Sequence, residues 1–165
     1  MAVYTFNLVP SFFHFFCLED ENADADLSGS WSEKAERNLL AIEPGAFGVG
    51  TLSGDYISVE VHVLHAEPED DNLDSWDHVI ECGIRIPSGK LVIRGAMEWF
   101  PTANRIDLEP GRYRARIYYG NLNWWDGDDG QGKDYYSVAL WPSQERGTRM
   151  IKERIFIPPP NPCVH

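Results

Sequence analysis

The strongest constraint on the fold is an alternation of apolar and polar side chains with a period of two residues. From Ile57 to Val63 every second residue is Ile or Val, and Ser, Glu and His lie between them. The same alternation runs through residues 80–86 and 112–119. Successive side chains of a β-strand point to opposite faces, so each run predicts a strand with one buried face.

Shorter runs rich in aromatic and β-branched residues predict further strands. They cover residues 3–8, 12–18, 46–51, 91–94, 104–108, 135–141 and 151–157. Pro87-Ser88-Gly89-Lys90 is typical of a hairpin turn between the strands on either side of it, and Glu109-Pro110-Gly111 marks another tight turn. About eight or nine strands without a strand–helix–strand rhythm predict a mainly β fold, an antiparallel β-sandwich.

One short α-helix is predicted at about residues 31–42. Ser30 followed by Glu33 has the spacing of a capping box, in which each side chain binds a backbone N–H at the helix start. Pro44-Gly45 marks the helix end. Four apolar residues form a stripe near helical spacing, which predicts the face that packs on the core: Trp31, Ala35, Leu39 and Ile42.

The size of the chain, 165 residues of which 43% are hydrophobic, fits one folded domain. We expect this domain to span residues 1–157, followed by a Pro-rich tail at 158–165 that cannot pair in a sheet. No apolar run approaches the roughly 20 residues of a membrane span. The three cysteines are far apart and the start lacks the basic region of a signal peptide, so we expect a cytoplasmic protein.

Charge is distributed unevenly along the chain, whose formal net charge is −12. Residues 1–81 contain 17 acidic and 2 basic residues, which gives −15, whereas residues 82–165 contain 9 acidic and 12 basic residues, which gives +3. One interpretation is that strands from both parts interleave and the charges cancel; the other is an acidic face that attracts a basic partner. Either way, direct binding to nucleic acid is disfavoured.

Two acidic segments are the candidate partner-binding regions. Residues 68–74 carry four acids, and residues 126–134 carry Asp and Gly beside two tryptophans. Solvated loops, contacts to Lys and Arg of a partner, and, for 126–134, calcium binding are the alternatives. An EF-hand is disfavoured, because loop positions six and twelve hold Gln131 and Ser137. The selected site residues are Asp70, Asp71, Asp74, Asp126, Asp128 and Asp129 for charge, with Trp124 or Trp125 as an apolar anchor.

Arg112, Arg114 and Arg116 share one face of a predicted strand. Alone, such a row suits phosphate; in so acidic a chain, pairing with cross-strand carboxylates such as Glu60 or Glu81 is favoured. The other polar motifs indicate no chemistry. His62, His65 and His78 lack metal-ligand spacing, and no nucleophile elbow, HExxH motif or Cys–His pairing is present, so we expect no enzyme, no metal and no cofactor.

Several stretches together resemble the competence protein J family, small proteins described as inhibitors of a DNA-entry nuclease. The resemblance extends over roughly residues 5–142. The resembling stretches are Phe12-Phe13-His14-Phe15, Trp31 to Pro44-Gly45, Trp76-Asp77-His78-Val79 leading into Ser88-Gly89, Pro110-Gly111-Arg112-Tyr113-Arg114, and residues 134–142. The resemblance implies a protein that inhibits by binding and offers no catalytic residues to transfer.

Charge and resemblance favour the same function, a non-enzymatic acidic binding protein that inhibits a basic nuclease or toxin, as immunity proteins do. An alternative is a β-sandwich module that binds carbohydrate or another small ligand on Trp124, Trp125 and Tyr135. A calcium-dependent binding module is a third.

Overall fold

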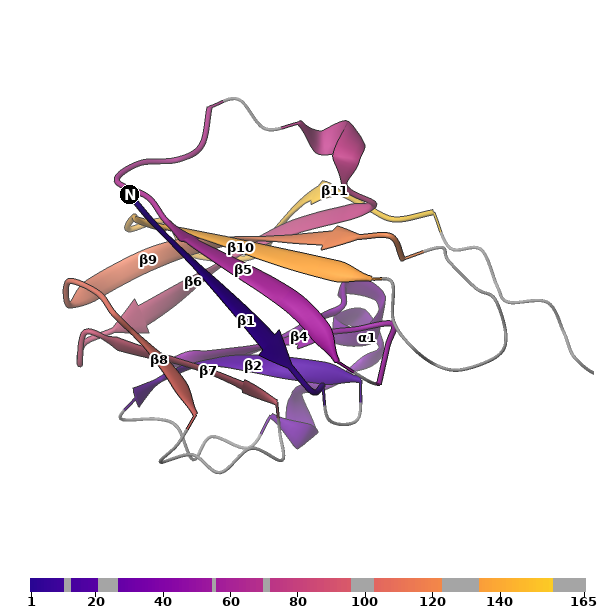
Figure 1. The fold of residues 1–165 in the computed structure, drawn as a ribbon, viewed down its shortest axis with the longest axis horizontal. Helices are drawn as coiled ribbons and strands as arrows, with labels where there is room; N and C mark the ends of the chain where they lie inside the picture. The colour runs from indigo at the N-terminus through magenta and orange to yellow at the C-terminus, as the bar shows by residue number, and fades with distance from the viewer. Residues whose placement is uncertain are drawn as a thin grey trace, which may run out of the picture.

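The computed structural model consists of two β-sheets packed face to face (Figure 1). It describes residues 1–10, 13–20, 27–54, 56–69, 72–95, 103–122 and 134–155. Within these residues the first sheet has six strands, in the order β1-β5-β10-β9-β6-β11. They span Ala2–Leu8 (β1), Ile57–Val63 (β5), His78–Ile86 (β6), Gly111–Gly120 (β9), Tyr135–Pro142 (β10) and Arg149–Lys152 (β11).

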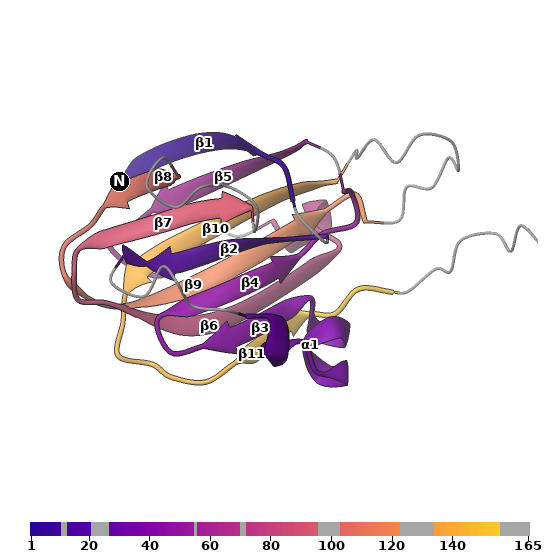
Figure 2. The same cartoon turned by 90° about the horizontal axis from the view of Figure 1, so that it is seen from below.

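The second sheet has five described strands, in the order β3-β4-β2-β7-β8, and lies in front of the first in Figure 2. They span His14–Glu19 (β2), Leu40–Glu43 (β3), Ala46–Gly50 (β4), Lys90–Gly95 (β7) and Asn104–Asp107 (β8). All described strand pairs are antiparallel except β5 and β10, which run parallel with Val59 opposite Tyr136. The predicted class, a mainly β sandwich with one short α-helix, is confirmed.

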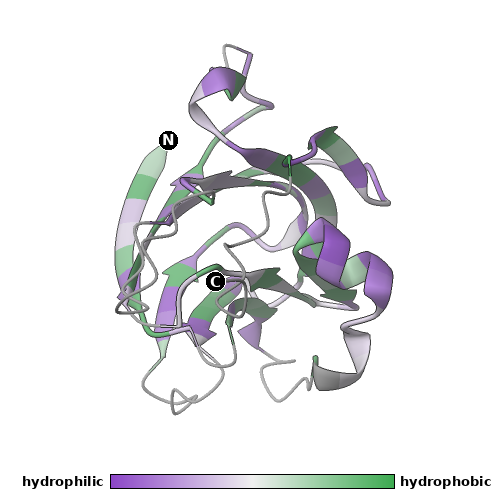
Figure 3. Cartoon of the chain, turned by 90° about the vertical axis from the view of Figure 1, so that its right-hand side faces the viewer, coloured by the Kyte–Doolittle hydropathy of each residue, from purple (hydrophilic) through white to green (hydrophobic). Residues whose placement is uncertain are grey.

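The core lies between the two sheets and is built by the predicted alternation. Val59, Ile80 and Ile117 of the six-stranded sheet point inward and meet Phe15 and Phe47 of the five-stranded sheet, all fully buried. Figure 3 shows the alternation as green and purple bands along the strands. Burying one face of every strand supplies the main driving force for this architecture, about 25 cal/mol for each Å² of apolar surface removed from water.

The turn at residues 87–89 corrects one prediction, because it does not close a hairpin. β6 belongs to the six-stranded sheet and β7 to the five-stranded one, so the chain crosses between the sheets here. The segment between β8 and β9 crosses in the same way, and the two corners touch through a hydrogen bond of 2.7 Å from Leu108 N to Gly89 O. A tight turn fixes only the local chain reversal, and the pairing partner of each strand is set by the core.

The helix is also shorter than predicted. α1 spans Glu33–Asn38, and its N-cap is Ser32, whose side chain accepts a hydrogen bond from Ala35 N. Ser30 instead donates to the Glu43 carboxylate, so the predicted capping box is wrong. Two 3-10 turns are described besides α1: η2 at Ser28–Ser30 and η3 at Leu73–Ser75.

Leu39 ends the helix, and a strand that the sequence does not predict follows it directly. Its φ of 57° is left-handed, and its backbone N–H caps α1 at the carbonyls of Ala35 and Glu36. The chain then reverses into β3, in which Leu40 pairs with Val49 of β4. Residues 40–42, the end of the predicted helix, therefore belong to an edge strand instead. Ile42 is correspondingly exposed.

The end of the chain is described only as far as Ile155. β11 covers Arg149–Lys152, so it begins before the strand predicted at 151–157 and shares only residues 151 and 152 with it; the predicted tail at 158–165 lies outside the described residues. No helix in the described part of the chain has the length and apolar character needed to cross a membrane.

The contact between the two corners predicts a strong effect of Gly89→Ala. Gly89 has a φ of 71°, and a Cβ there would lie 2.7 Å from the Leu108 carbonyl oxygen. We expect the free energy of unfolding to fall by about 2–4 kcal/mol, from left-handed strain plus overpacking. Gly147→Ala is the matched control, because Gly147 has a φ of 87° with no atom within 4 Å of a Cβ. Equal losses in urea denaturation of the two variants would contradict the contact.

Candidate functional site

The outer face of the six-stranded sheet, turned away from the core, carries a cluster of buried charges. Every second residue of β9 points there, which places Arg112, Arg114 and Arg116 in one row, as predicted. In the neighbouring strand β6, Glu81 lies opposite Arg116 and Gly83 lies opposite Arg114. We call this surface the outer face.

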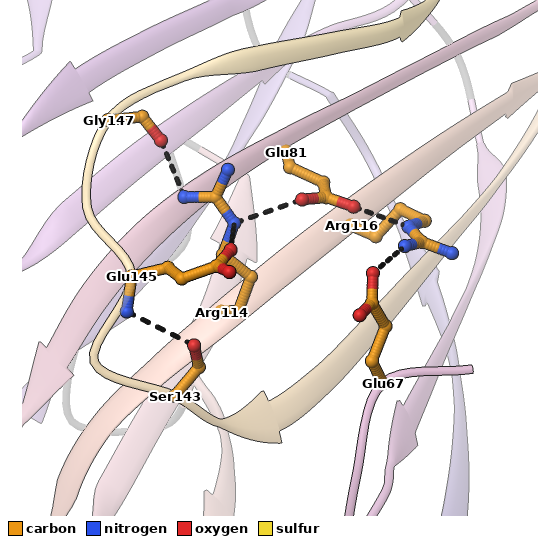
Figure 4. A network of polar contacts seen from close by, with 7 residues as sticks. All are labelled: Glu67, Glu81, Arg114, Arg116, Ser143, Glu145 and Gly147. Carbon is orange, nitrogen blue, oxygen red and sulfur yellow. Dashed lines mark hydrogen bonds and ion pairs between the residues drawn. The ribbon is translucent and has the colours of Figure 1, made fainter. Parts of the chain in front are cut away.

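Glu81 binds two of these arginines at once (Figure 4). Its Oε1 accepts from Arg114 Nε at 3.0 Å and its Oε2 from Arg116 Nε at 2.7 Å. The Glu81 side chain is only 1% exposed. The predicted cross-strand pairing of Arg114 and Arg116 is thus confirmed with Glu81, whereas Glu60 contacts His62 instead.

Two loops attach to this buried centre through further contacts of the same arginines (Figure 4). Arg116 Nη2 binds the carboxylate of Glu67 at 2.8 Å. Arg114 donates to the carbonyl oxygen of Gly147 and has Glu145 at 3.8 Å. The Arg116 guanidinium also lies 5.3 Å from the ring centroid of Trp141, within cation–π range. The loops on either side are therefore fixed to the sheet by charge.

The segment that follows Glu67 carries exposed acids above the outer face. It rises over the six-stranded sheet at the top of Figure 1. Glu67, Glu69 and Asp74 are exposed, and the Leu73 carbonyl accepts a hydrogen bond from Lys152 at 3.0 Å. Asp77 is half-buried, and its carboxylate accepts a hydrogen bond from Leu122 N at 2.7 Å. Asp77 therefore has a structural role and is not counted among the exposed acids. We call Glu67, Glu69 and Asp74 the acidic ridge.

A small pocket of about 270 Å³ opens beneath this segment. Its aromatic wall is Trp76 and Tyr118, whose ring centroids are 5.3 Å apart, and Tyr135 packs on Trp76 at 5.4 Å. Polar and aliphatic side chains complete the lining: His62, Leu64, Pro68, Ser137 and Ala139. Trp76 and Tyr118 are not among the site residues predicted from the sequence. The only signals were a tryptophan within an acidic segment and a tyrosine in phase with the three arginines.

Most of the predicted site residues lie outside the described residues. Asp74 is described, and it is exposed on η3 as a partner contact requires. The other predicted site residues belong to segments outside the described residues: Asp70, Asp71, Trp124, Trp125, Asp126, Asp128 and Asp129.

Asp134, at the end of the second acidic segment, has a structural role. Its Oδ2 accepts hydrogen bonds from Leu52 N at 3.1 Å, from Ser53 N at 3.0 Å and from the Tyr136 hydroxyl. Burial and the adjacent carboxylate raise the pKa of Tyr136 well above its ordinary value. This carboxylate therefore fixes the loop between β4 and β5.

His62, His65 and His78 make contacts within the fold, His78 in the interior and the other two nearer the surface. Buried His78 binds the Asn38 carbonyl through Nε2 at 2.8 Å and accepts from Arg154 N through Nδ1 at 3.1 Å. Because Nδ1 accepts, the proton is on Nε2, and desolvation lowers the pKa of this ring. His62 and His65 contact Glu60 and the N-terminal amine respectively. No group of three metal-ligating side chains occurs among the described residues.

The described cysteines do not offer a nucleophile. Cys17 and Cys82 are free and buried in the core. Burial raises the pKa of the Cys82 thiol to about 12, so almost none is thiolate at neutral pH. The groups that the outer face offers to a ligand or partner are charged and aromatic side chains.

Two solved structures share this fold. The first is ComJ of Bacillus subtilis, described as an inhibitor of the DNA degrading activity of NucA, with a TM-score of 0.66 and 14% identity over 85% of this chain and 96% of that one. The second is the crocagin biosynthetic gene J protein, with a TM-score of 0.55 and 18% identity over 87% of this chain and 100% of that one. No protein-family model and no curated protein matches the chain. The resemblance seen in the sequence is confirmed at the level of the fold.

The buried centre predicts that removing the charge of Glu81 is costly. Glu81→Gln leaves Arg114 and Arg116 without their shared counter-charge in a site closed to water, and we expect a loss of about 3–5 kcal/mol in unfolding free energy. Glu145→Gln is the control, because this side chain is 72% exposed and its contact with Arg114 is 3.8 Å long. There we expect at most about 1 kcal/mol. Similar urea midpoints for both variants would refute the assignment of Glu81 as the centre.

Proposed function

We propose that this protein is a non-enzymatic binding protein whose acidic ridge docks a basic partner protein. The observation that carries the proposal is the attachment of the ridge to the buried centre. Glu67 is held by Arg116, which is itself held by Glu81. Exposed acids on a fixed base lose little conformational freedom on binding, so more of the electrostatic attraction is retained in the complex.

The charge of the ridge suits a partner rich in Lys and Arg. Complementary charge steers encounter and raises the association rate more than it raises the affinity. We propose that Asp70 and Asp71 extend the ridge, and that Asp126, Asp128, Asp129 and one of Trp124 and Trp125 complete the interface. An acidic surface with an aromatic anchor is a common arrangement at protein interfaces.

The class of partner that we propose is a basic nuclease or toxin. Nucleases hold the phosphate backbone with Lys and Arg, so their substrate surface is complementary to a row of carboxylates. ComJ, which shares the fold, is described as an inhibitor of a DNA-degrading activity, and this supports the proposal. Two free buried thiols in the described part of the chain fit a reducing, cytoplasmic setting, which we include in the proposal.

The proposal predicts that binding is steered by the acidic ridge. The full chain is used to capture partners from lysate, and the association rate of the captured protein is measured at about 50 mM and 500 mM salt. We expect the association rate of the original protein to fall at least about tenfold at high salt. At low salt, we expect the double variant Glu69→Lys/Asp74→Lys to associate more slowly than the original protein by a similar factor.

The control variant is Glu36→Lys/Glu109→Lys, which changes the net charge by the same amount at two exposed positions away from the ridge. It should keep most of the association rate of the original protein. A rate that is insensitive to salt, or that falls equally in both double variants, would rule out steering by the ridge.

The aromatic pocket supports a second candidate function, the binding of a carbohydrate or another small ligand. Tyr135 is 43% exposed and packs on Trp76, which lines the pocket. Aromatic faces beside hydroxyl and imidazole groups are typical of sites that stack on sugar rings. Of the platform predicted from the sequence, Tyr135 is the part that the structure describes.

This second function predicts a fluorescence response to sugars. Titration with a glycan panel should change the tryptophan emission of the original protein, because Trp76 would lose contact with water on binding. Trp76→Phe should remove most of that response, and Trp31→Phe, at the end of η2 and beside the other sheet, should leave it. A response that survives Trp76→Phe would place the ligand elsewhere, and no response to any glycan would leave the partner-binding proposal alone.

A further inference from the structure

Three arginines gather at the end of the outer face that is not neutralised by Glu81. Arg85 and Arg146 are exposed and Arg112 is half-buried. Arg114 and Arg116 have carboxylate partners, whereas no ion pair joins Arg85, Arg112 or Arg146 to a carboxylate among the described residues. An unpaired cationic cluster is unexpected in a chain with a net charge of −12.

The sheet register forces these charges together. Arg85 lies directly opposite Arg112 in the antiparallel pair of β6 and β9. Like charges directly opposite each other destabilise a sheet. Gly83, two residues before Arg85, lets residues 145 and 146 approach the sheet closely, because a Cβ there would lie only 3.1 Å from the Glu145 carbonyl oxygen and 3.5 Å from Arg112 Nη1. The backbone of residues 145 and 146 thus folds over β6 and brings the third arginine to the pair.

The cluster surrounds a hollow of about 480 Å³, which we call the arginine recess. Its lining residues carry guanidinium and carboxamide donors and no carboxylate: Arg85, Pro87, Gly111, Arg112, Gln144 and Arg146. Partial desolvation is the largest cause that lowers the pKa of Arg112, and the nearby positive charges of Arg146 and Arg85 lower it further. A group that supplies negative charge in the recess would relieve this repulsion.

We propose that the arginine recess binds the phosphate group of a small phosphate monoester. A phosphate dianion neutralises two of the three guanidinium charges, and the paired N–H donors of these groups match its oxygen atoms. A single carboxylate would leave most of the positive charge uncompensated. This site is separate from the acidic ridge and does not depend on the proposed partner.

The surroundings of the recess favour a small ester over a nucleic acid. A second hollow of about 700 Å³ shares Arg85, Pro87 and Arg112 with the recess, and its other side carries Glu19 and Glu43 beside exposed Ile42. These carboxylates repel a second phosphate, while the apolar surface accepts the uncharged part of an ester. A polymer also requires many phosphate contacts, which a chain of this net charge opposes.

The test is a calorimetric and thermal titration of the full chain with inorganic phosphate at constant ionic strength. We expect saturable binding of one phosphate per chain and a rise in melting temperature, because a ligand of the folded form stabilises it. Arg112→Gln should weaken phosphate binding at least about tenfold, the effect of losing one charge-assisted contact. The same variant should melt no lower than the original protein without phosphate, since it removes a repulsion.

Three comparisons decide the result. Arg37→Gln, at the exposed C-terminal end of α1, is the matched control and should leave phosphate binding unchanged. Acetate should not compete, and a 12-nucleotide single-stranded DNA should not bind more tightly than phosphate. The proposal fails if phosphate has no saturable effect, or if Arg112→Gln and Arg37→Gln respond alike. Tighter binding of the DNA, with a steep salt dependence, would assign the recess to nucleic acid instead.

Discussion

The interaction on which the outer face depends is the double ion pair of Glu81. Each of its oxygens binds a different guanidinium, and the side chain is almost fully enclosed. Bringing three charges out of water is unfavourable unless every hydrogen-bonding atom finds a partner with good geometry. Arg114 and Arg116 meet this condition by turning their remaining donors to the loops at Gly147 and Glu67. The two loops are therefore held in place because they supply the hydrogen-bond acceptors that the buried arginines need.

The sequence predicted those features that depend on residue type and spacing within one strand. The period of two identified β5, β6 and β9, and it placed Arg114 and Arg116 on one face with Glu81 as a candidate partner. It failed where the outcome depends on distant segments. The turn at Gly89 has the same local chemistry whether it closes a hairpin or crosses between sheets, and only the packing of both corners decides. β3 was missed because Leu39, a good helix former, adopts a left-handed conformation beside Gly50.

The candidate site was predictable to a smaller extent for the same reason. Acidic composition selected the segment that contains Asp74, and the structure places it above the outer face. The contact between Trp76 and Tyr118 joins residues that are far apart in the sequence, and only the fold brings them together. The interleaving of strands also decides the question raised by the uneven charge. At Glu81 a negative charge of residues 1–81 is neutralised by arginines of residues 82–165. At Arg85 and Arg112 the positive charges lie opposite each other and are not neutralised within the described part of the chain.

The parallel pairing of β5 with β10 has a consequence for the order in which the molecule is made. β5 enters the middle of its sheet, but the strand that covers its second edge is synthesised more than 70 residues later. Until then, a nascent chain exposes an unpaired edge of alternating valines, which is the kind of segment that associates with other chains. Contacts this distant in sequence also slow folding. We therefore expect the six-stranded sheet to close only after β10 has been synthesised, so that the pairing of β5 is a late step of folding.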